Sequence, residues 1–188
     1  TDFGFTEEEI HTYFSGHRGY HIHVENEAIK SLDTMARKEI VDYVCGNGLK
    51  LFDKNKEKRK GAKGKTSTSS FRLADYGWGR RLRNGMRKFV QSASKSDFKK
   101  IGVKTNVDAI LKDKDAVLKR CFEDNYWSSV NAVGFETWMH IAEHVKNQEA
   151  AQIDTVVTSD IHRLIRANGT LHGKTGLLKV EFPLKDLD

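Results

Sequence analysis

The chain has 188 residues, of which 38% are hydrophobic and 31% charged, which predicts one globular domain with a sizeable core. It contains no run of about 18 apolar residues, so we expect a soluble protein without a membrane span. Its 32 Lys and Arg outweigh its 26 Asp and Glu, and the formal net charge of +6 favours an anionic partner: DNA, RNA, a nucleotide or an acidic lipid.

The two cysteines, Cys45 and Cys121, stand alone and do not form a CxxC pair. This excludes a secreted disulfide scaffold, shows no zinc site and favours a reducing, intracellular compartment. The sequence begins at Thr1 without Met, which favours a piece of a longer protein.

The first predicted element is a β-hairpin. Residues 11–15 and 20–25 alternate or run apolar on either side of a glycine turn, which is typical of two strands joined by a tight turn. After the hairpin, apolar residues recur at helical spacing. This spacing predicts helices over 26–45, 80–92, 107–125 and 135–146.

The C-terminal part of the chain changes character. Residues 153–157 are rich in β-branched side chains and predict a strand, 160–166 predict a short helix, and 177–182 predict another strand. Strands near both ends must unite in one sheet, with helices between them. The sequence therefore predicts a mixed α/β (α+β) fold.

Basic residues gather in two clusters. The first lies in a Gly-containing stretch without aromatic residues, which we interpret as a loop: Lys54, Lys56, Lys58, Arg59, Lys60, Lys63 and Lys65. The second follows Trp78 at a spacing that a helix turns into one basic face: Arg80, Arg81, Arg83, Arg87 and Lys88. Cations beside aromatic rings can hold phosphates while the rings stack on bases, so both clusters are candidate nucleic-acid contacts. The alternative is a solvated loop and a solvated helix face.

A polar segment, SGHRGYHIH, occupies the predicted hairpin turn and the start of the second strand. Its glycines let the backbone approach an anion, Ser15 offers a hydroxyl, and Arg18 and His21 can donate to phosphate oxygens. The alternatives are a structural turn with incidental histidines and a metal pair of His21 and His23, which would share one strand face but lack a third nearby ligand.

A second polar segment runs through 154–176 and combines two carboxylates with four basic or imidazole side chains: Asp154, Asp160, Arg163, Arg166, His172 and Lys174. Such a set offers a divalent-cation ligand and counter-charges for a polyphosphate. The position of Asp160 fits the N-cap of a helix over 161–166, whereas Asp154 has no such structural role.

These segments resemble a known family. The strings SGHRGYHIHV at 15–24 and IDTVVTSDIHRLIRANGTLHGKTGL at 153–177 resemble, in the family's order, two motifs of the archaeal and eukaryotic-type DNA primase small, catalytic subunit. The resemblance implies a primase catalytic-core fold, with an open mixed sheet, flanking helices and a helical subdomain over 79–150.

The resemblance also implies roles for individual residues. Asp154 becomes a metal-coordinating catalytic aspartate. The triphosphate-binding groups become Ser15, His17, Arg18, His21, Arg163, Arg166, His172 and Lys174. The implied chemistry is nucleotidyl transfer at a two-metal site holding Mg²⁺ or Mn²⁺, in which a 3′-hydroxyl attacks the α-phosphate of a nucleoside triphosphate.

The function implied by the resemblance is the synthesis of short RNA primers on single-stranded DNA in replication. Its implied partners are the primase large subunit in a heterodimer, the single-stranded DNA template, nucleoside triphosphates and the replication machinery. The implied location is cytoplasmic in an archaeon and nuclear in a eukaryote.

One family motif is missing from the sequence. A DxD pair that holds the metals is expected before Ser15, but Asp2 is the sole aspartate there, and Asp113-Lys114-Asp115 lies in the wrong order in a Lys-rich stretch. We therefore expect residues 1–188 to be a partial catalytic domain that is inactive in isolation. The alternatives are a split half that needs a DxD-bearing segment, a non-catalytic nucleotide- or nucleic-acid-binding module, and a basic assembly subunit that holds DNA.

Overall fold

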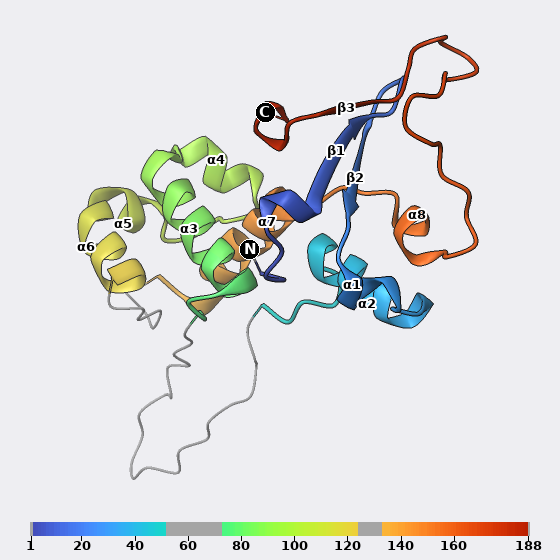
Figure 1. Cartoon of the computed structure of the whole chain (residues 1–188). Coiled ribbons are helices and arrows are strands. Elements are labelled where there is room, and N and C mark those ends of the chain that lie inside the picture. Colours follow the sequence, from blue (N-terminus) through green and yellow to red (C-terminus); the bar gives the residue numbers. More distant parts are fainter. Residues whose placement is uncertain (1, 52–72, 124–132, 188) are drawn as a thin grey trace. The chain divides into compact units, whose positions relative to one another are not determined.

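A computed structural model describes residues 2–51, 73–123 and 133–187 of the chain. These residues form two compact units, drawn in Figure 1. The first unit combines Thr1–Asp42 with Ile153–Asp188, and the second unit is Tyr43–Gln152. No helix within the described ranges is long and apolar enough to cross a membrane.

The first unit contains a three-stranded antiparallel sheet in the order β2-β1-β3. Its strands are β1 (Ile10–Phe14), β2 (Tyr20–Val24) and β3 (Val180–Phe182). Phe14 pairs with Tyr20 in β2 and with Val180 in β3, so the central strand joins the two ends of the chain. The predicted hairpin is confirmed.

Short helices flank these strands. They are the 3-10 helices η1 (Glu7–Glu9) and η3 (Leu184–Asp186) and the α-helices α1 (Glu27–Lys30), α2 (Thr34–Cys45) and α8 (Thr155–Ser159). The end of α2, from Tyr43 on, belongs to the second unit. The single helix expected over 26–45 is thus two helices. The break occurs because Asp33 Oδ1 accepts a hydrogen bond from the Ala36 N–H, 2.8 Å away, as an N-cap residue does at the start of a new helix.

The predicted strand over 153–157 is wrong. Asp154 Oδ1 accepts the N–H of Val156 at 3.2 Å and caps α8 there, so the β-branched residues begin a helical turn. β-branched residues favour a strand when neighbouring strands pack beside them, and here the local cap decides. The idea that Asp154 has no structural role is wrong for the same reason.

The predicted helix over 160–166 is also wrong, and so is the role of Asp160 as its N-cap. Asp160 ends α8, and its Oδ1 accepts the N–H of His162 at 2.9 Å in a local turn. The last strand is shorter than the predicted 177–182, because Leu178 takes part only in an isolated bridge with Leu171 before β3 begins.

The second unit is helical. Its elements are α3 (Gly77–Ser92), α4 (Lys95–Lys100), α5 (Val107–Lys112), α6 (Lys114–Leu118), the π-helix η2 (Lys119–Glu123) and α7 (Phe135–Glu149). The predicted helices over 80–92 and 135–146 are confirmed with longer bounds. The predicted helix over 107–125 is divided as far as residue 123, because Asp113 leaves the helical region at φ −119° and ψ 40°. Residues 124 and 125 lie outside the described ranges.

The core of the second unit forms where α3 packs against α7. Trp138, Ile141 and Met86 are fully buried in it. Gly85 of α3 lies so close to α7 that a Cβ atom there would collide with Cγ1 of Val145.

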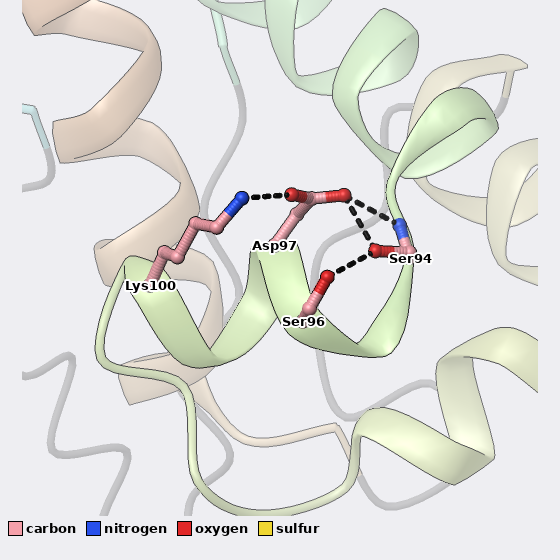
Figure 2. A network of polar contacts seen from close by, with 4 residues as sticks. All are labelled: Ser94, Ser96, Asp97 and Lys100. Carbon is pink, nitrogen blue, oxygen red and sulfur yellow. Dashed lines mark hydrogen bonds and ion pairs between the residues drawn. The ribbon is translucent and has the colours of Figure 1, made fainter.

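A network of polar contacts begins α4 (Figure 2). The Asp97 carboxylate accepts hydrogen bonds from the Ser94 N–H at 3.0 Å and from the Ser94 hydroxyl at 2.6 Å, and Lys100 Nζ donates to its other oxygen at 3.0 Å. These bonds hold the pKa of Asp97 well below its usual range. A carboxylate in the first turn also suits the positive end of the helix dipole.

The helices and the antiparallel sheet together confirm a mixed α/β fold. The helices expected between 79 and 150 lie in the second unit, which also includes residues on both sides of that range. The division of 1–188 into a partial catalytic domain and a helical subdomain stays a prediction.

Candidate phosphate-binding site

The turn between β1 and β2 is closed by Ser15. Its N–H donates to the Gly19 carbonyl at 2.9 Å, and its Oγ accepts the N–H groups of Gly19 at 3.2 Å and His17 at 3.4 Å. Gly16 has φ +81°, a conformation that side-chain-bearing residues rarely adopt. The closed turn leaves His17 and Arg18 exposed.

A second tight loop lies between Leu171 and Leu178, which pair in an isolated β-bridge. The His172 N–H donates to the Leu177 carbonyl at 2.8 Å, and the His172 carbonyl accepts from the Gly176 N–H at 2.8 Å. Gly176 has φ +70°, which permits this reversal. The loop therefore holds His172 by its own backbone.

The two loops contact each other directly, although they are far apart in the sequence. Thr175 Oγ1 donates to the Gly16 carbonyl at 2.6 Å, and the rings of His17 and His172 stack with centroids 5.2 Å apart and planes 8° from parallel. A Cβ on Gly16 would lie 2.9 Å from the Leu177 carbonyl oxygen. Both loops lie at the same end of β1 and β2 in Figure 1.

Arg166 adds a third connection to this end of the sheet. Its Nη1 donates to the Ser15 carbonyl at 2.7 Å, and its side chain is partly buried. Arg166 thus lies against the turn, while Arg18 and Lys174 extend from the two loops as exposed cations. We call the following residues of the two loops, of β2 and of the segment before the second loop the phosphate cluster: Ser15, His17, Arg18, His21, Arg166, His172 and Lys174.

The electrostatics of the phosphate cluster favour an anion. The pKa of His172 is lowered by partial desolvation, then by Arg166, His17 and Lys174. The pKa of His21 is lowered by partial burial, then by Lys179 and Arg166. His172 Nδ1 accepts the Lys174 N–H at 3.3 Å, so a neutral His172 carries its proton on Nε2, where it can donate. The arrangement offers fixed cations and neutral N–H donors to phosphate oxygens.

Asp154 and Arg163 pair with each other. Arg163 Nη2 is 3.5 Å from Asp154 Oδ2, and both side chains are exposed. Within the described ranges, no hydrogen bond or ion pair connects these two residues to the cluster. The structure therefore brings together the predicted residues of the two loops and Arg166, but not Asp154 or Arg163.

The described residues do not by themselves fit a divalent metal ion. They contain no group of three or more His, Cys, Asp or Glu side chains placed to hold one. Asp154 faces a cation and caps α8 instead of facing a second carboxylate. His21 and His23 stack with ring centroids 6.4 Å apart.

The candidate nucleic-acid residues lie in the second unit or outside the described ranges. Arg80 is exposed on α3, Arg81 lies 5.7 Å from the centroid of the Trp78 ring, and Arg83 forms an ion pair with Asp75. The residues outside the described ranges are Lys54, Lys56, Lys58, Arg59 and Lys60. Nucleic-acid binding by either group stays a prediction.

Sequence reasoning missed two residues of this region. Thr175 links the two loops through Gly16, and Lys179 is buried beneath them with 1% of its surface exposed. In the motif around Thr175, the sequence predicts phosphate binding by His172 and Lys174, because imidazole and ammonium groups can donate to phosphate oxygens. The Thr175 hydroxyl is not distinguished from an ordinary surface hydroxyl. Nothing in the local sequence marks Lys179 as buried, since Tyr13 and His23, which lie against its ammonium group, belong to strands far away in the sequence.

Comparison with known proteins identifies the family. The family model for the DNA primase small subunit matches residues 1–184. The DNA primase small subunit PriS of Methanococcoides burtonii is 34% identical over 201 residues, covering 100% of this chain and 51% of the relative. The PriS proteins of Methanothrix thermoacetophila and Natronomonas pharaonis are 32% and 35% identical, covering 100% and 94% of this chain and 52% and 47% of the relative.

The matches cover nearly all of this chain but only part of each relative. The chain spans about half the length of these relatives. The match includes the Ser15–Gly19 turn, the His172 loop and all three strands of the sheet. This chain belongs to the DNA primase small subunit family.

Proposed function

We propose that this chain is the part of a primase small subunit that binds the triphosphate of an incoming nucleotide, in an enzyme that makes RNA primers on single-stranded DNA during replication. The observation that carries the proposal is the direct contact between the Ser15–Gly19 turn and the His172 loop. That contact gathers the phosphate cluster on one end of a sheet. The match of the family model over residues 1–184 supports this function over that of a non-catalytic module.

The residues of the phosphate cluster have distinct roles in this proposal. Arg166 and Arg18 donate to phosphate oxygens, and Arg166 is oriented by its bond to the Ser15 carbonyl. His172 and His21 donate from neutral imidazole rings, and Lys174 adds an exposed cation. Ser15 holds the turn closed, which places its backbone beside the anion.

The metal is a separate part of the proposal. Asp154 offers one carboxylate ligand for Mg²⁺ or Mn²⁺, which would neutralise phosphate charge in nucleotidyl transfer. The described residues supply no cluster to complete such a site, so we assign no step of the reaction to it. We expect the isolated chain to bind nucleotide without synthesising primers, because the sequence holds no DxD pair before Ser15.

The partners follow from the same proposal. We expect the primase large subunit, single-stranded DNA and the replication machinery to act with the complete enzyme. Arg80, Arg81 and Arg83 are proposed template contacts, supported by their position beside Trp78 on α3.

Calorimetric titration of the chain with ATP and with adenosine tests the proposed function. We expect ATP to bind and adenosine to bind at least about tenfold more weakly, because the cluster recognises phosphate. Arg166→Met should weaken ATP binding about tenfold or more, through loss of a charge-assisted contact.

The matched control for this titration is Arg120→Met, which removes an exposed arginine in the second unit. It should leave ATP affinity unchanged. Equal binding of ATP and adenosine would contradict the proposal, and so would equal losses in the two arginine variants.

A further inference from the structure

Lys179 is a buried lysine beneath the phosphate cluster. Its Nζ donates to the Arg166 carbonyl at 2.8 Å, lies 3.3 Å from His23 Nε2 and lies 4.6 Å from the centroid of the Tyr13 ring. Its side chain thus contacts the segment that carries Arg166, as well as β2 and β1. With 1% of its surface exposed, it is one of the most completely buried side chains described.

The backbone of Lys179 is also fixed. Its N–H donates to the Thr170 carbonyl at 2.9 Å, and its carbonyl accepts the Gly169 N–H at 2.9 Å. These bonds lie between Arg166 and the His172 loop in the sequence. Two backbone hydrogen bonds therefore join Lys179, which follows the His172 loop, to the segment that precedes the loop.

The ammonium group of Lys179 forms no ion pair among the described residues. Its neighbours are a carbonyl, an imidazole and an aromatic face, and the nearby charge that acts on it is the like charge of Arg166. Burial followed by Arg166 lowers the pKa of Lys179. A buried cation without a carboxylate is costly, and an apolar side chain of similar length would fill the same space beside Tyr13 at lower cost.

We propose that Lys179 is a positioning residue of the phosphate site: it holds the Arg166 backbone against the turn, orients His23 as a hydrogen-bond acceptor and contributes positive charge that a bound triphosphate compensates. This inference rests on the proposed function. It explains why a lysine, and not an apolar residue, is buried at this point.

The pKa values of the neighbouring histidines, His21 and His23, depend on the charge of Lys179. His23 can accept from Nζ only while its Nε2 is unprotonated. The groups that act on His23 are Lys179, His21 and Glu25, together with His11 and Tyr13 of β1. Burial lowers the pKa of His23 most, followed by Lys179 and His21, while Glu25 opposes the shift.

The experiment compares Lys179→Met, Lys179→Arg and the control Lys185→Met in the full chain. Lys185 is an exposed lysine of η3, so the control removes the same charge outside the cluster. NMR titration measures the pKa values of His21 and His23 without nucleotide, and calorimetry measures the affinity for ATP without added metal.

We expect Lys179→Met to raise the pKa values of His21 and His23 and to weaken ATP binding about tenfold, as expected for loss of a charged hydrogen-bonding group. Lys179→Arg should keep both pKa values low, and Lys185→Met should change neither readout. Thermal unfolding should show that Lys179→Met is at least as stable as the wild type, since the burial cost is removed.

The results that would overturn the inference are distinct from those that would overturn the proposed function. If the wild type binds ATP and Lys179→Met binds it equally well, Lys179 has no positioning role. If Lys179→Met does not fold, a rise of the His23 pKa in folded Lys179→Arg would overturn the inference. If the wild type itself does not bind ATP, the proposed function fails, while the histidine titration still tests the charge of Lys179.

Discussion

At the scale of single residues, Gly16 is the point where the turn and the His172 loop meet. Its φ of +81° already favours glycine, and a Cβ would lie 2.9 Å from the Leu177 carbonyl oxygen and 3.0 Å from His172 Cβ. Neither neighbour can withdraw easily, because the first is backbone and the second carries the stacked imidazole. The site therefore depends on the absence of a side chain at this position.

Replacing Gly16 with alanine tests that dependence. We expect Gly16→Ala to separate the two loops, weaken ATP binding about tenfold or more and destabilise the first unit by about 1–3 kcal/mol through backbone strain and overpacking. Calorimetry and thermal unfolding measure the two effects. Gly4→Ala is the control, since Gly4 also has positive φ, at +76°, but has open space around its Cβ position. Unchanged ATP binding in Gly16→Ala would show that the loop contact is unnecessary.

The histidines predict a pH dependence of stability. The pKa values of His21 and His23 are lowered in the fold from 6.5, chiefly by burial. The unfolded chain therefore takes up protons first as the pH falls, so this part of the stability is present above pH 6.5 and is lost as the pH drops through the folded pKa values. Solvent screens both rings, so the loss should stay below about 1 kcal/mol.

Urea unfolding between neutral and mildly acidic pH measures this dependence. His23→Gln should reduce the dependence of unfolding free energy on pH, because it removes a group whose pKa differs between the folded and the unfolded chain. The exposed His162 is the control position, where His162→Gln should leave the slope as in the wild type. A wild-type stability that rises on acidification through this range would contradict the assignment.

The sequence motifs identified residues with recognisable phosphate chemistry but not the residues that support them. Ser15, Arg166 and His172 are predicted from the residues themselves, because hydroxyl, guanidinium and imidazole groups can donate to phosphate oxygens. The phosphate role of His17 is predicted from the family resemblance alone. Lys179 could not be predicted as buried, since Tyr13 and His23 approach it only after the sheet forms.

At the scale of elements, the close approach of α3 and α7 organises the second unit. Gly85 lies against Val145, and these helices bury Met86, Trp138 and Ile141 between them and their neighbours. The absence of a Cβ on Gly85 therefore sets how closely the two helices pack.

Gly85→Ala tests this packing. Alanine is a better helix former than glycine by about 1 kcal/mol, yet the collision with Val145 should make the variant less stable by about 1–3 kcal/mol. The control is Gly134→Ala before α7, where a Cβ meets open space. Thermal unfolding followed by the far-UV signal of the helices measures both. A Gly85→Ala variant that is more stable than the wild type would show that the helices can move apart freely.

Helices and strands with a strong periodic pattern of apolar residues are predicted correctly, and short segments without one are not. The helices at 80–92 and 135–146 are predictable because each buries one continuous apolar face, which the spacing of apolar residues shows directly. The prediction of a strand and a helix within 153–166 is wrong, because the Asp154 and Asp160 side chains accept hydrogen bonds from the backbone two residues further on. Such local bonds override β propensity and helical spacing in a segment this short.

At the scale of the whole molecule, the net charge of +6 does not indicate which basic side chains bind an anion. In the first unit, Arg166 donates to the Ser15 carbonyl in the turn, and Lys179 donates to the Arg166 carbonyl. In the second unit, Arg83 pairs with Asp75 and Arg81 lies over Trp78. Composition predicted an anionic partner, and only the fold distinguishes cations that gather at one site from those with local partners.

NMR titration of the isotopically labelled chain with ATP tests the central claim, that the two loops form one triphosphate site. We predict that the ring signals of His17 and His172 and the amide signals of Gly16, Gly19 and Gly176 shift together along one binding curve. Inorganic tripolyphosphate should shift the same signals, and adenosine should not. Shifts that arise at α3 while these five residues stay unchanged would contradict the account.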